Sequence, residues 1–314
     1  MSIAVRQQGI HLVAESTPGT YQEPAAGDAL EVENLKIQPF EQLRLVERNP
    51  YRAIFGPQVP AFGGSLFGMT FDVELKGSGT AGVAPRVGRV LRAAGFAETI
   101  VANTSVTYQP TSELNAQASL SGVVREGPNL RRVRGAKVAS LSINCETGQR
   151  IMASVTLLAR RQSEGVAAAL AQTLEATTPP TFLNAAFTAD GAQRAINALA
   201  IEMGLQVNTA PDPNDPDGFG QIRITDRAVT GSFDPEADSI STYDPIGGLR
   251  SEREFVIQSG VVGATAGNRV AISMPRCRYM AISDEEREML KVWGIDFGAF
   301  STGVGDDEIA IQFT

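Results

Sequence analysis

The segment GSGTAG at residues 77–82 has the sharpest spacing for chemistry in this chain, because it is a literal GxGxxG between a predicted strand and a predicted helix. Glycines at that place let a pyrophosphate approach a helix N-terminus. A doubly wound sheet needs further alternation of strands and helices, and none follows. Pro85 delays the helix beyond the last glycine, and the nearest acid, Glu98, lies on a predicted loop. The pattern favours a flexible strand-to-helix connection, with a nucleotide-binding enzyme using Gly77–Gly82 as the alternative.

The segment Asp212–Gly218 is rich in carboxylates and superficially resembles a calcium-binding loop. An EF-hand loop takes alternating oxygen ligands and closes with a glutamate at its twelfth position. Here Pro216 occupies a ligand position, and Arg223 stands at position 12. We therefore expect a solvated turn between two strands.

Two clusters of charge stand out, the basic Arg131-Arg132-x-Arg134 and the acidic run from Asp284 to Glu288. No aromatic residues interleave the arginines, so they do not indicate a groove for single-stranded nucleic acid. Two interpretations stay open for the basic cluster: a loop that pairs with acidic residues of a neighbour, or a solubilising tip. The acidic run is ambiguous in the same way.

Histidine and cysteine are scarce. His11 is the only histidine, which rules out a His-based triad or a multi-His metal site within one chain. Cys145 and Cys277 lie far apart without CxxC spacing, so two buried thiols in a reducing compartment are expected, and a disulfide is neither indicated nor excluded. We predict no catalytic, cofactor-binding or metal-binding residue, no cofactor and no enzymatic activity.

Composition narrows the class of protein further. The chain has 314 residues, of which 43% are hydrophobic, enough for one large domain or two of ordinary size. Its net charge of −8 makes it a poor candidate for holding nucleic acid through phosphates. The start of the chain lacks an apolar h-region, and no apolar run approaches the roughly 20 residues that span a bilayer. We expect a protein made and folded in a cytoplasm, without a membrane partner.

Alternating apolar residues predict a mainly β chain with many turns. Residues 1–30 are turn-rich and predict either an arm that packs on something else or a floppy terminus, and a long polar segment spans 40–58. Strands are predicted at Leu30–Ile37, Ser65–Leu75, Ser105–Tyr108, Ala118–Arg125, Lys137–Cys145, Arg150–Ala159, Ala198–Val207, Gly220–Thr225, Val229–Asp234, Glu254–Ser259, Asn268–Met274, Glu288–Phe300 and Glu308–Phe313.

One helix is predicted after Pro85, which suits a first helical turn. Its apolar stripe has i, i+3, i+4, i+7 spacing, and Gly95 is placed for a left-handed C-cap. The stripe consists of Val87, Val90, Leu91 and Ala94. Arg86, Arg89 and Arg92 lie largely off the stripe and are expected on a solvated face. Residues 166–176 are compatible with a second, short helix before a Thr/Pro-rich stop.

Short motifs recur in the same order in the two halves of the chain, which predicts an internal duplication. The recurring pairs are Ser121–Val124 with Ser259–Val262, Gly135-x-x-Val138-Ala139 with Gly267-x-x-Val270-Ala271, Cys145 with Cys277, Leu35-x-Ile37 with Leu199-x-Ile201, and Ser65 with Gly231-Ser232. The two cysteines lie 132 residues apart (277 − 145). Similar modules side by side imply pseudo-symmetry, which favours closed rings.

The chain resembles the tail tube (major tail) proteins of siphophages along nearly its whole length. The resembling segments are Glu15–Thr20 with Ala29–Val32, Phe71–Gly82, Val90–Thr99, Ser105–Tyr108, Ile224–Ser232 and Gly305–Phe313. In that family the glycine-rich string is a strand-to-helix connection. No single segment identifies the family, but the order of the segments along the chain does. Another virion interaction protein, such as a tail terminator or a decoration protein, is the alternative.

The resemblance implies two tandem tail-tube-like modules, each a β-sandwich or split barrel with at most one flanking helix. Their strands would contribute to a closed inner β-barrel. The expected division is an N-terminal arm at 1–30, a first module at 31–161, a linker at 162–195 and a second module at 196–314. Two modules in each chain would make a pseudo-hexameric ring from a homotrimer; without a duplication, a true hexamer is the alternative.

The resemblance also implies a function and partners. Stacked rings would form a long non-contractile tail tube in the virion, assembled in the host bacterial cytoplasm. DNA would pass transiently through the lumen without specific binding, and acidic lumen residues would repel phosphate. The expected partners are further copies of the chain, the tape measure protein, the tail terminator and the distal tail protein. Segments 40–60 and 207–221 are candidate hairpin loops that reach an adjacent ring or subunit.

Overall fold

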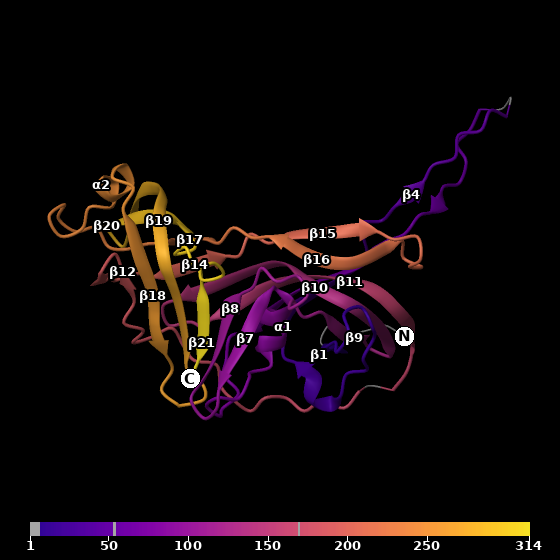
Figure 1. The fold of residues 1–314 in the computed structure, drawn as a ribbon, viewed down its shortest axis with the longest axis horizontal. Coiled ribbons are helices and arrows are strands. Elements are labelled where there is room, and N and C mark those ends of the chain that lie inside the picture. The colour runs from indigo at the N-terminus through magenta and orange to yellow at the C-terminus, as the bar shows by residue number, and fades with distance from the viewer. Residues whose placement is uncertain (1–6, 53–54, 169) are drawn as a thin grey trace.

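The computed structural model describes residues 7–52, 55–168 and 170–314, and strands dominate it (Figure 1). The helical elements are η2 (Ala26–Asp28), α1 (Val87–Ala93) and α2 (Pro245–Arg250). The strands of the first half are β1 (Gln8–Ala14), β2 (Ala29–Leu30), β3 (Glu33–Glu41), β4 (Leu45–Val46), β5 (Ala61–Phe62), β6 (Leu66–Glu74), β7 (Phe96–Val101), β8 (Ser105–Pro110), β9 (Leu120–Glu126), β10 (Asn129–Glu146) and β11 (Met152–Val166). Those of the second half are β12 (Thr188–Ala189), β13 (Ala192–Gln193), β14 (Ala198–Glu202), β15 (Gln206–Pro211), β16 (Phe219–Asp226), β17 (Thr230–Phe233), β18 (Glu254–Val262), β19 (Val270–Arg287), β20 (Leu290–Ala299) and β21 (Ala310–Phe313).

Eight strands follow one another in a single antiparallel series, β3–β6–β11–β10–β14–β17–β20–β19. The two halves of the chain meet in the middle of this series, where Ser142–Glu146 of β10 pair with Ala198–Glu202 of β14. The sheet therefore continues across the boundary between the halves without a break.

The long strands β10 and β19 each belong to two layers, because their first parts pair with different neighbours from their last parts. Asn129–Ala136 of β10 pair with β9, which in turn pairs with β1. The first part of β19 pairs with β18 and β21, and β21 continues the second layer to β8 of the first half. Among the described residues the pairings end at β2, β3, β7 and β13, so they do not close into a barrel within one chain.

One continuous apolar core lies between these layers. The side of the eight-strand series that faces it contributes a row of buried residues: Phe71, Val155, Leu141, Ile143, Ile201, Phe233 and Ile295. Helix α1 closes the core of the first half with Val87, Val90 and Leu91, all buried as the apolar stripe predicts. Gly95 follows it with a φ of +86°, the left-handed conformation expected of a helix cap.

Several local predictions were wrong. The arginines of α1 are not on a free solvated face, because Arg86 approaches Glu175 and donates to the carbonyl of Ala29, and Arg89 pairs with Asp28 at 2.8 Å. The described part of 166–176 is not helical. Past the end of β11 it is irregular and forms hydrogen bonds with other segments; the Thr173 amide, for example, donates to the carbonyl of Ala26.

Two further differences concern strands. Residues 198–207 are not one strand, because a turn at Gly204 separates β14 from β15. Gly204 has a φ of +53°, and a Cβ there would lie 2.3 Å from the carbonyl oxygen of Ala228. Glu98 lies on strand β7 rather than on a loop, and it accepts the Tyr108 hydroxyl at 2.6 Å.

Candidate functional site

The eight-strand sheet has two faces of opposite character. Away from the core, directly paired residues form a row of small polar and acidic side chains across six strands: Asp72, Ser154, Ser142, Glu202, Thr230 and Gly298. A second row reads Asn144, Ala200, Ser232 and Asp296. No aromatic residue stands in either row, although Met152 of β11 pairs directly with Asn144. Along these rows the face is mainly polar, whereas Leu66 and Leu158 give it an apolar patch at one end.

Both end strands of the sheet carry a free edge. Strand β3 pairs with β6 on one side, and among the described residues no strand pairs with its other side. The end of β19, Ser283–Arg287, pairs with β20 alone. Unpaired amide and carbonyl groups at such edges are a template for another strand. The chain thus offers a continuous sheet that is incomplete at both ends.

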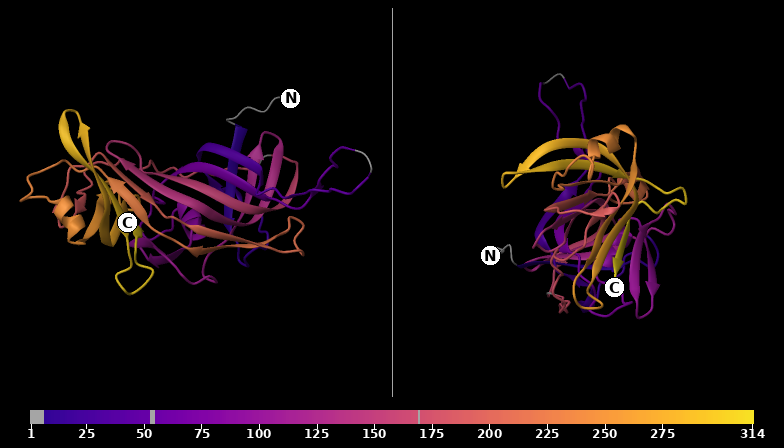
Figure 2. Two further views of the ribbon diagram at one scale, coloured as in Figure 1. Left: turned by 90° about the horizontal axis from the view of Figure 1, so that it is seen from above. Right: turned by 90° about the vertical axis from the view of Figure 1, so that its left-hand side faces the viewer.

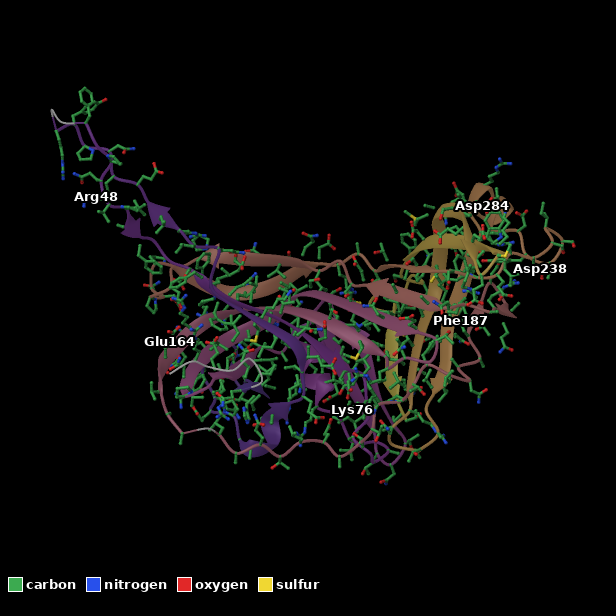
Figure 3. All side chains as sticks on the ribbon, turned by 180° about the vertical axis from the view of Figure 1, so that it is seen from behind. Arg48, Lys76, Glu164, Phe187, Asp238 and Asp284 are labelled. Atoms are coloured by element: carbon green, nitrogen blue, oxygen red, sulfur yellow. The ribbon has the colours of Figure 1, made fainter. Side chains whose placement is uncertain are left out.

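The segment 42–64 between β3 and β6, here called the first arm, projects from the body (Figures 2 and 3). It contains the short pair β4–β5, and Arg48 marks its outer part in Figure 3. Its exposed large hydrophobic residues are Leu43, Leu45, Val46, Tyr51, Phe55, Val59 and Phe62. An exposed apolar hairpin of this kind marks a protein-binding element.

The segment 206–226 between β14 and β17, here called the second arm, lies along β10 and β11 (Figure 1). Its Phe219 and Ile222 are buried against Leu66 and Leu158 of the first half. Ile224 exchanges both backbone hydrogen bonds with the side chain of Gln117. The second arm is therefore a docked element that leaves its own half to cover the other.

An ion-pair cluster fixes the tip of the second arm. Asp215 accepts hydrogen bonds from Arg134 and Arg160, both at 2.9 Å, and the Asp215 side chain is 5% exposed. Asp217 accepts the backbone amide of Arg161 at 2.9 Å, and burial raises the pKa of its carboxyl. The predicted turn between two strands at Asp212–Gly218 is confirmed, but it is only partly solvated, because Asp215 and Asp217 anchor the arm on β10 and β11.

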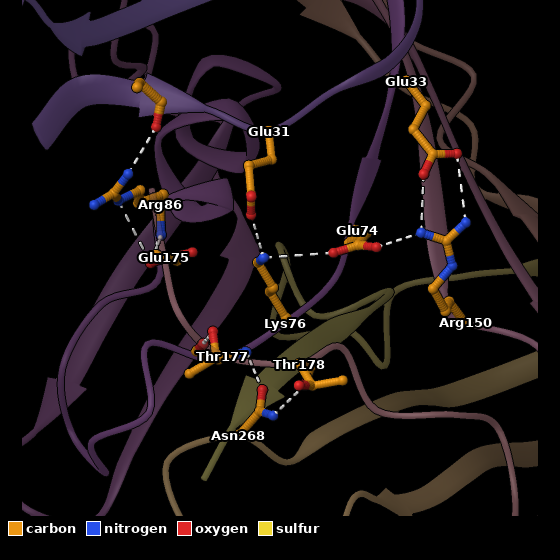
Figure 4. Close-up of polar contacts among 12 residues, drawn as sticks. Glu31, Glu33, Glu74, Lys76, Arg86, Arg150, Glu175, Thr177, Thr178 and Asn268 are labelled. Atoms are coloured by element: carbon orange, nitrogen blue, oxygen red, sulfur yellow. Dashed lines mark hydrogen bonds and ion pairs between the residues drawn. The ribbon is translucent and has the colours of Figure 1, made fainter. Parts of the chain in front are cut away.

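The glycine-rich segment Gly77–Gly82 connects β6 to α1, as the sequence predicts, and two of its glycine amides bond to the second half of the chain. Gly77 donates to the side chain of Asn268, and Gly79 donates to the carbonyl of Gly267 (Figure 4 shows Asn268 and the neighbouring linker). A Cβ on Gly77 would lie 2.1 Å from that carbonyl oxygen. The glycines thus allow the first half to approach the second closely, which explains the motif without a cofactor.

The segment 173–178 runs beside this junction and is held by both halves (Figure 4). Glu175 accepts from the amide of Arg86, and Thr177 donates to the carbonyl of Gly77. The nearby cavity of about 760 Å³, bordered by Gly79 and residues 177–184 and 261–268, has no charged residue in its lining. Nothing in that lining would recognise a phosphate group.

The two clusters of charge lie on strands. Arg131, Arg132 and Arg134 belong to β10 and pair with Glu126, Glu23 and Asp215 of the same chain, so they form neither a loop nor a free tip. The acidic run belongs to the end of β19, at its free edge. There, Asp284 pairs with Lys291 at 2.8 Å, and Glu285 is exposed.

The two cysteines are buried, as the sequence predicts. Cys145 and Cys277 are buried free thiols, and burial raises the pKa of each to about 12. His11 is buried in β1, with Nε2 3.2 Å from the carbonyl of Ala171. Within the described residues no three His, Cys, Asp or Glu side chains gather as a metal site, and no helix is long and apolar enough to cross a membrane.

Comparison with known proteins identifies the family. A family model described as "Phage tail tube protein" matches residues 6–264, which is most of the chain. No curated protein matches the sequence significantly. The family implies a structural component of a bacteriophage tail that self-assembles into a tube, and the incomplete, two-faced sheet fits that role. This chain therefore belongs to the phage tail tube protein family.

Proposed function

We propose that this chain is the structural subunit of a long non-contractile tail, in which stacked rings enclose a lumen that conducts DNA. The observation that carries the proposal is the eight-stranded sheet with a free edge at each end and a small, polar outer face. Pairing with further copies satisfies both edges and removes an aggregation liability. A repeated sheet that closes on itself gives a ring.

The two halves repeat one strand order, which supports tandem modules at 31–161 and 196–314. The order is β3–β6–β11–β10 in the first half and β14–β17–β20–β19 in the second. In each half a long arm follows the first of these strands, and a helix follows the next strand of the chain. Residues 1–30 then form an N-terminal arm, and 162–195 a linker.

The ladders also repeat in register. Starting from Ile37, cross-strand partners lead through Met69 and Leu157 to Val138. Starting from Ile201, they lead through Gly231 and Phe297 to Tyr279. Both ladders have an irregularity immediately after the last residue of this path. Val138 and Tyr279 thus correspond, 141 residues apart (279 − 138), so the cysteine match at an offset of 132 is not part of the repeat.

This correspondence predicts how copies join. Within the chain, Ser142–Glu146 of β10 pair with Ala198–Glu202 of β14. The equivalent segments are Ser283–Arg287 of β19 and residues 34–38 of β3, whose edges are both free. A second copy that pairs in the same register places Lys36 opposite Glu285, an attractive cross-strand pair of opposite charges.

Three copies would close a ring of 24 strands, since each chain contributes eight. With strands about 4.8 Å apart, the barrel would measure roughly 115 Å around and 37 Å across before strand tilt widens it. Barrels of about 16 to 18 strands already leave an aqueous channel. The face with Asp72, Glu202 and Asp296 would line the lumen, where its carboxylates repel phosphate and keep DNA from binding.

The first arm would reach an adjacent subunit or ring, where its exposed apolar residues become buried. The open ends of the stacked tube would contact the tail terminator and the distal tail protein, and the lumen would hold the tape measure protein. Assembly would take place in the host bacterial cytoplasm before the tube is part of the virion tail.

Electron microscopy of the concentrated protein tests the proposal. We expect stacked rings with six similar lobes in end view and a mass of three chains for each ring in native mass spectrometry. Rings of six chains would contradict the tandem-module arrangement. Persistent monomers under all conditions, including with a tape measure partner, would contradict the tube.

A further inference from the structure

A cavity of about 240 Å³ opens where the second arm, the N-terminal segment and strands β10 and β11 meet. Three basic residues border it, Lys137, Arg160 and Arg223, and among the described residues no carboxylate does. Its other polar side chains are those of Asn115, Gln117, Ser119 and Gln221. Docking of the second arm accounts for Arg160, which bonds to Asp215, but not for Lys137 or Arg223.

Lys137 is the central observation, because it is 4% exposed and has no counterion in contact. Within the part of the chain that the structure describes, no hydrogen bond or ion pair reaches its ammonium group. Burial lowers the pKa of Lys137 to about 8, although the charge of Glu15 works in the opposite direction. An ammonium group that is largely withdrawn from water and lacks a counterion is costly, and an anion in the cavity would relieve that cost.

Arg160 brings a second positive charge to the border of the same cavity. Its Nη1 donates to Asp215 at 2.9 Å, whereas its buried Nε has no partner among the described residues.

The two carboxylates nearby are already occupied. Glu15 accepts four hydrogen bonds, from the amides of Gly19 and Gly135 and from the hydroxyls of Ser119 and Ser121. Asp215 is shared between Arg134 and Arg160. Neither acid lies within ion-pair distance of Lys137, so the charge in the cavity is left uncompensated.

We propose that this cavity binds a small oxyanion of the phosphate type, held by the ammonium group of Lys137 beside the guanidinium groups of Arg160 and Arg223, which border the cavity. Charge-assisted hydrogen bonds from a lysine and an arginine suit an oxyanion, which has several acceptor oxygens. Because the cavity lies between the second arm and the first half, the bound anion would strengthen the docking of the arm. The site does not depend on the number of chains in a ring.

The direct test observes the four lysines of the folded full-length chain, which are Lys36, Lys76, Lys137 and Lys291. With ¹³C-labelled lysine, sodium phosphate is added while the ionic strength is kept constant with chloride. We expect a saturable change confined to the Lys137 signal and a rise of its pKa above about 9, because the anion favours the charged form. Equal changes at all four lysines, or none at millimolar phosphate, would overturn the proposal.

A variant pair gives an independent readout from thermal unfolding. Phosphate should raise the Tm of the natural protein and of Lys291→Met, whose lysine is exposed, but not the Tm of Lys137→Met. A phosphate-induced rise in Lys137→Met as large as in the natural protein would contradict the site. If Lys137→Met does not fold, the phosphate titration followed by the lysine spectra of the natural protein tests the proposal by itself.

The pH dependence has a definite sign. Between pH 8 and 10.5 the unfolded chain still carries the Lys137 proton and the folded chain does not. The contribution of Lys137 to stability without phosphate therefore increases as the pH rises through that range. Bound phosphate should reduce this increase, and an unchanged increase would count against the anion.

Discussion

The first and second arms leave the sheet at corresponding points, after β3 and after β14, but their surroundings are opposite. Phe219 of the second arm is fully buried, whereas Phe55 of the first arm is fully exposed. Carboxylates of the second arm bind three arginine residues of the first half, while the outer part of the first arm extends away from the body (Figure 3). One chain thus contains a docked arm and a free arm. The contacts of the docked arm indicate what the free arm would need, which is a neighbouring half to cover.

The proposed tandem order explains this difference. The second arm covers the first half of its own chain, whereas in the proposed ring the first arm would cover the second half of another copy. The correspondence of Val138 with Tyr279 makes Met280 the equivalent of Ala139, which packs beside the docked second arm. Met280 and, near it, Phe300 are exposed large hydrophobic residues on β19 and after β20. They are the expected receptor for the first arm.

Removing the ion pairs that anchor the second arm should lower the free energy of unfolding more than any other change proposed here. Asp215→Ala leaves Arg134 and Arg160 without their shared counterion, so we expect the free energy of unfolding to fall by about 3–5 kcal/mol. Chemical denaturation measures this loss. Glu164→Ala is the matched control, since its carboxylate is exposed, and its effect should stay within about 0.5 kcal/mol. Similar losses in both variants would show that Asp215 is not an anchor.

A pair of identical substitutions compares the arms directly. Phe219→Ala removes a buried ring and should cost about 3 kcal/mol in unfolding free energy. Phe55→Ala removes an exposed ring and should change the stability of the isolated subunit by less than about 0.5 kcal/mol, yet it should slow tube growth measured by light scattering. If Phe55→Ala assembled at the natural rate, the first arm would not use this ring as a contact.

The sequence predicted most of the strands and the helix α1, because alternation and 3.6-residue spacing are local signals. Pro85 and Gly95 marked the ends of the helix, and SLFGMTFDVEL marked β6. Strand β1 was missed, since the turn-rich start of the chain hides a short strand that pairs along all of β9. The pairing of β1 depends on residues of β9 that are distant in sequence, and the local sequence of β1 does not indicate it.

Features that depend on distant partners could not be predicted. The arginines at 131–134 and the acids at 212–218 were treated as separate surface clusters, although Arg134 and Asp215 contact each other over a separation of 81 residues. Lys137 lies at an ordinary position in a predicted strand, and the segments that surround it, including the second arm, are distant in sequence. The motifs predict a repeat, but the register of the proposed repeat comes from the strand ladders, which give an offset of 141 rather than 132 residues.

Cysteine cross-linking of assembled tubes tests the central claim that β3 and β19 of neighbouring copies pair. Lys36→Cys combined with Glu285→Cys places two thiols on directly opposite strand positions, within reach of a disulfide. The native thiols are buried, with pKa values raised to about 12, and should not compete. Gln38→Cys with Arg287→Cys is the control, because the same register separates these positions by about 13 Å. We predict a covalent trimer from the first pair alone on a denaturing gel without reductant. No cross-link from that pair, equal cross-linking of the control, or a covalent hexamer would contradict the account.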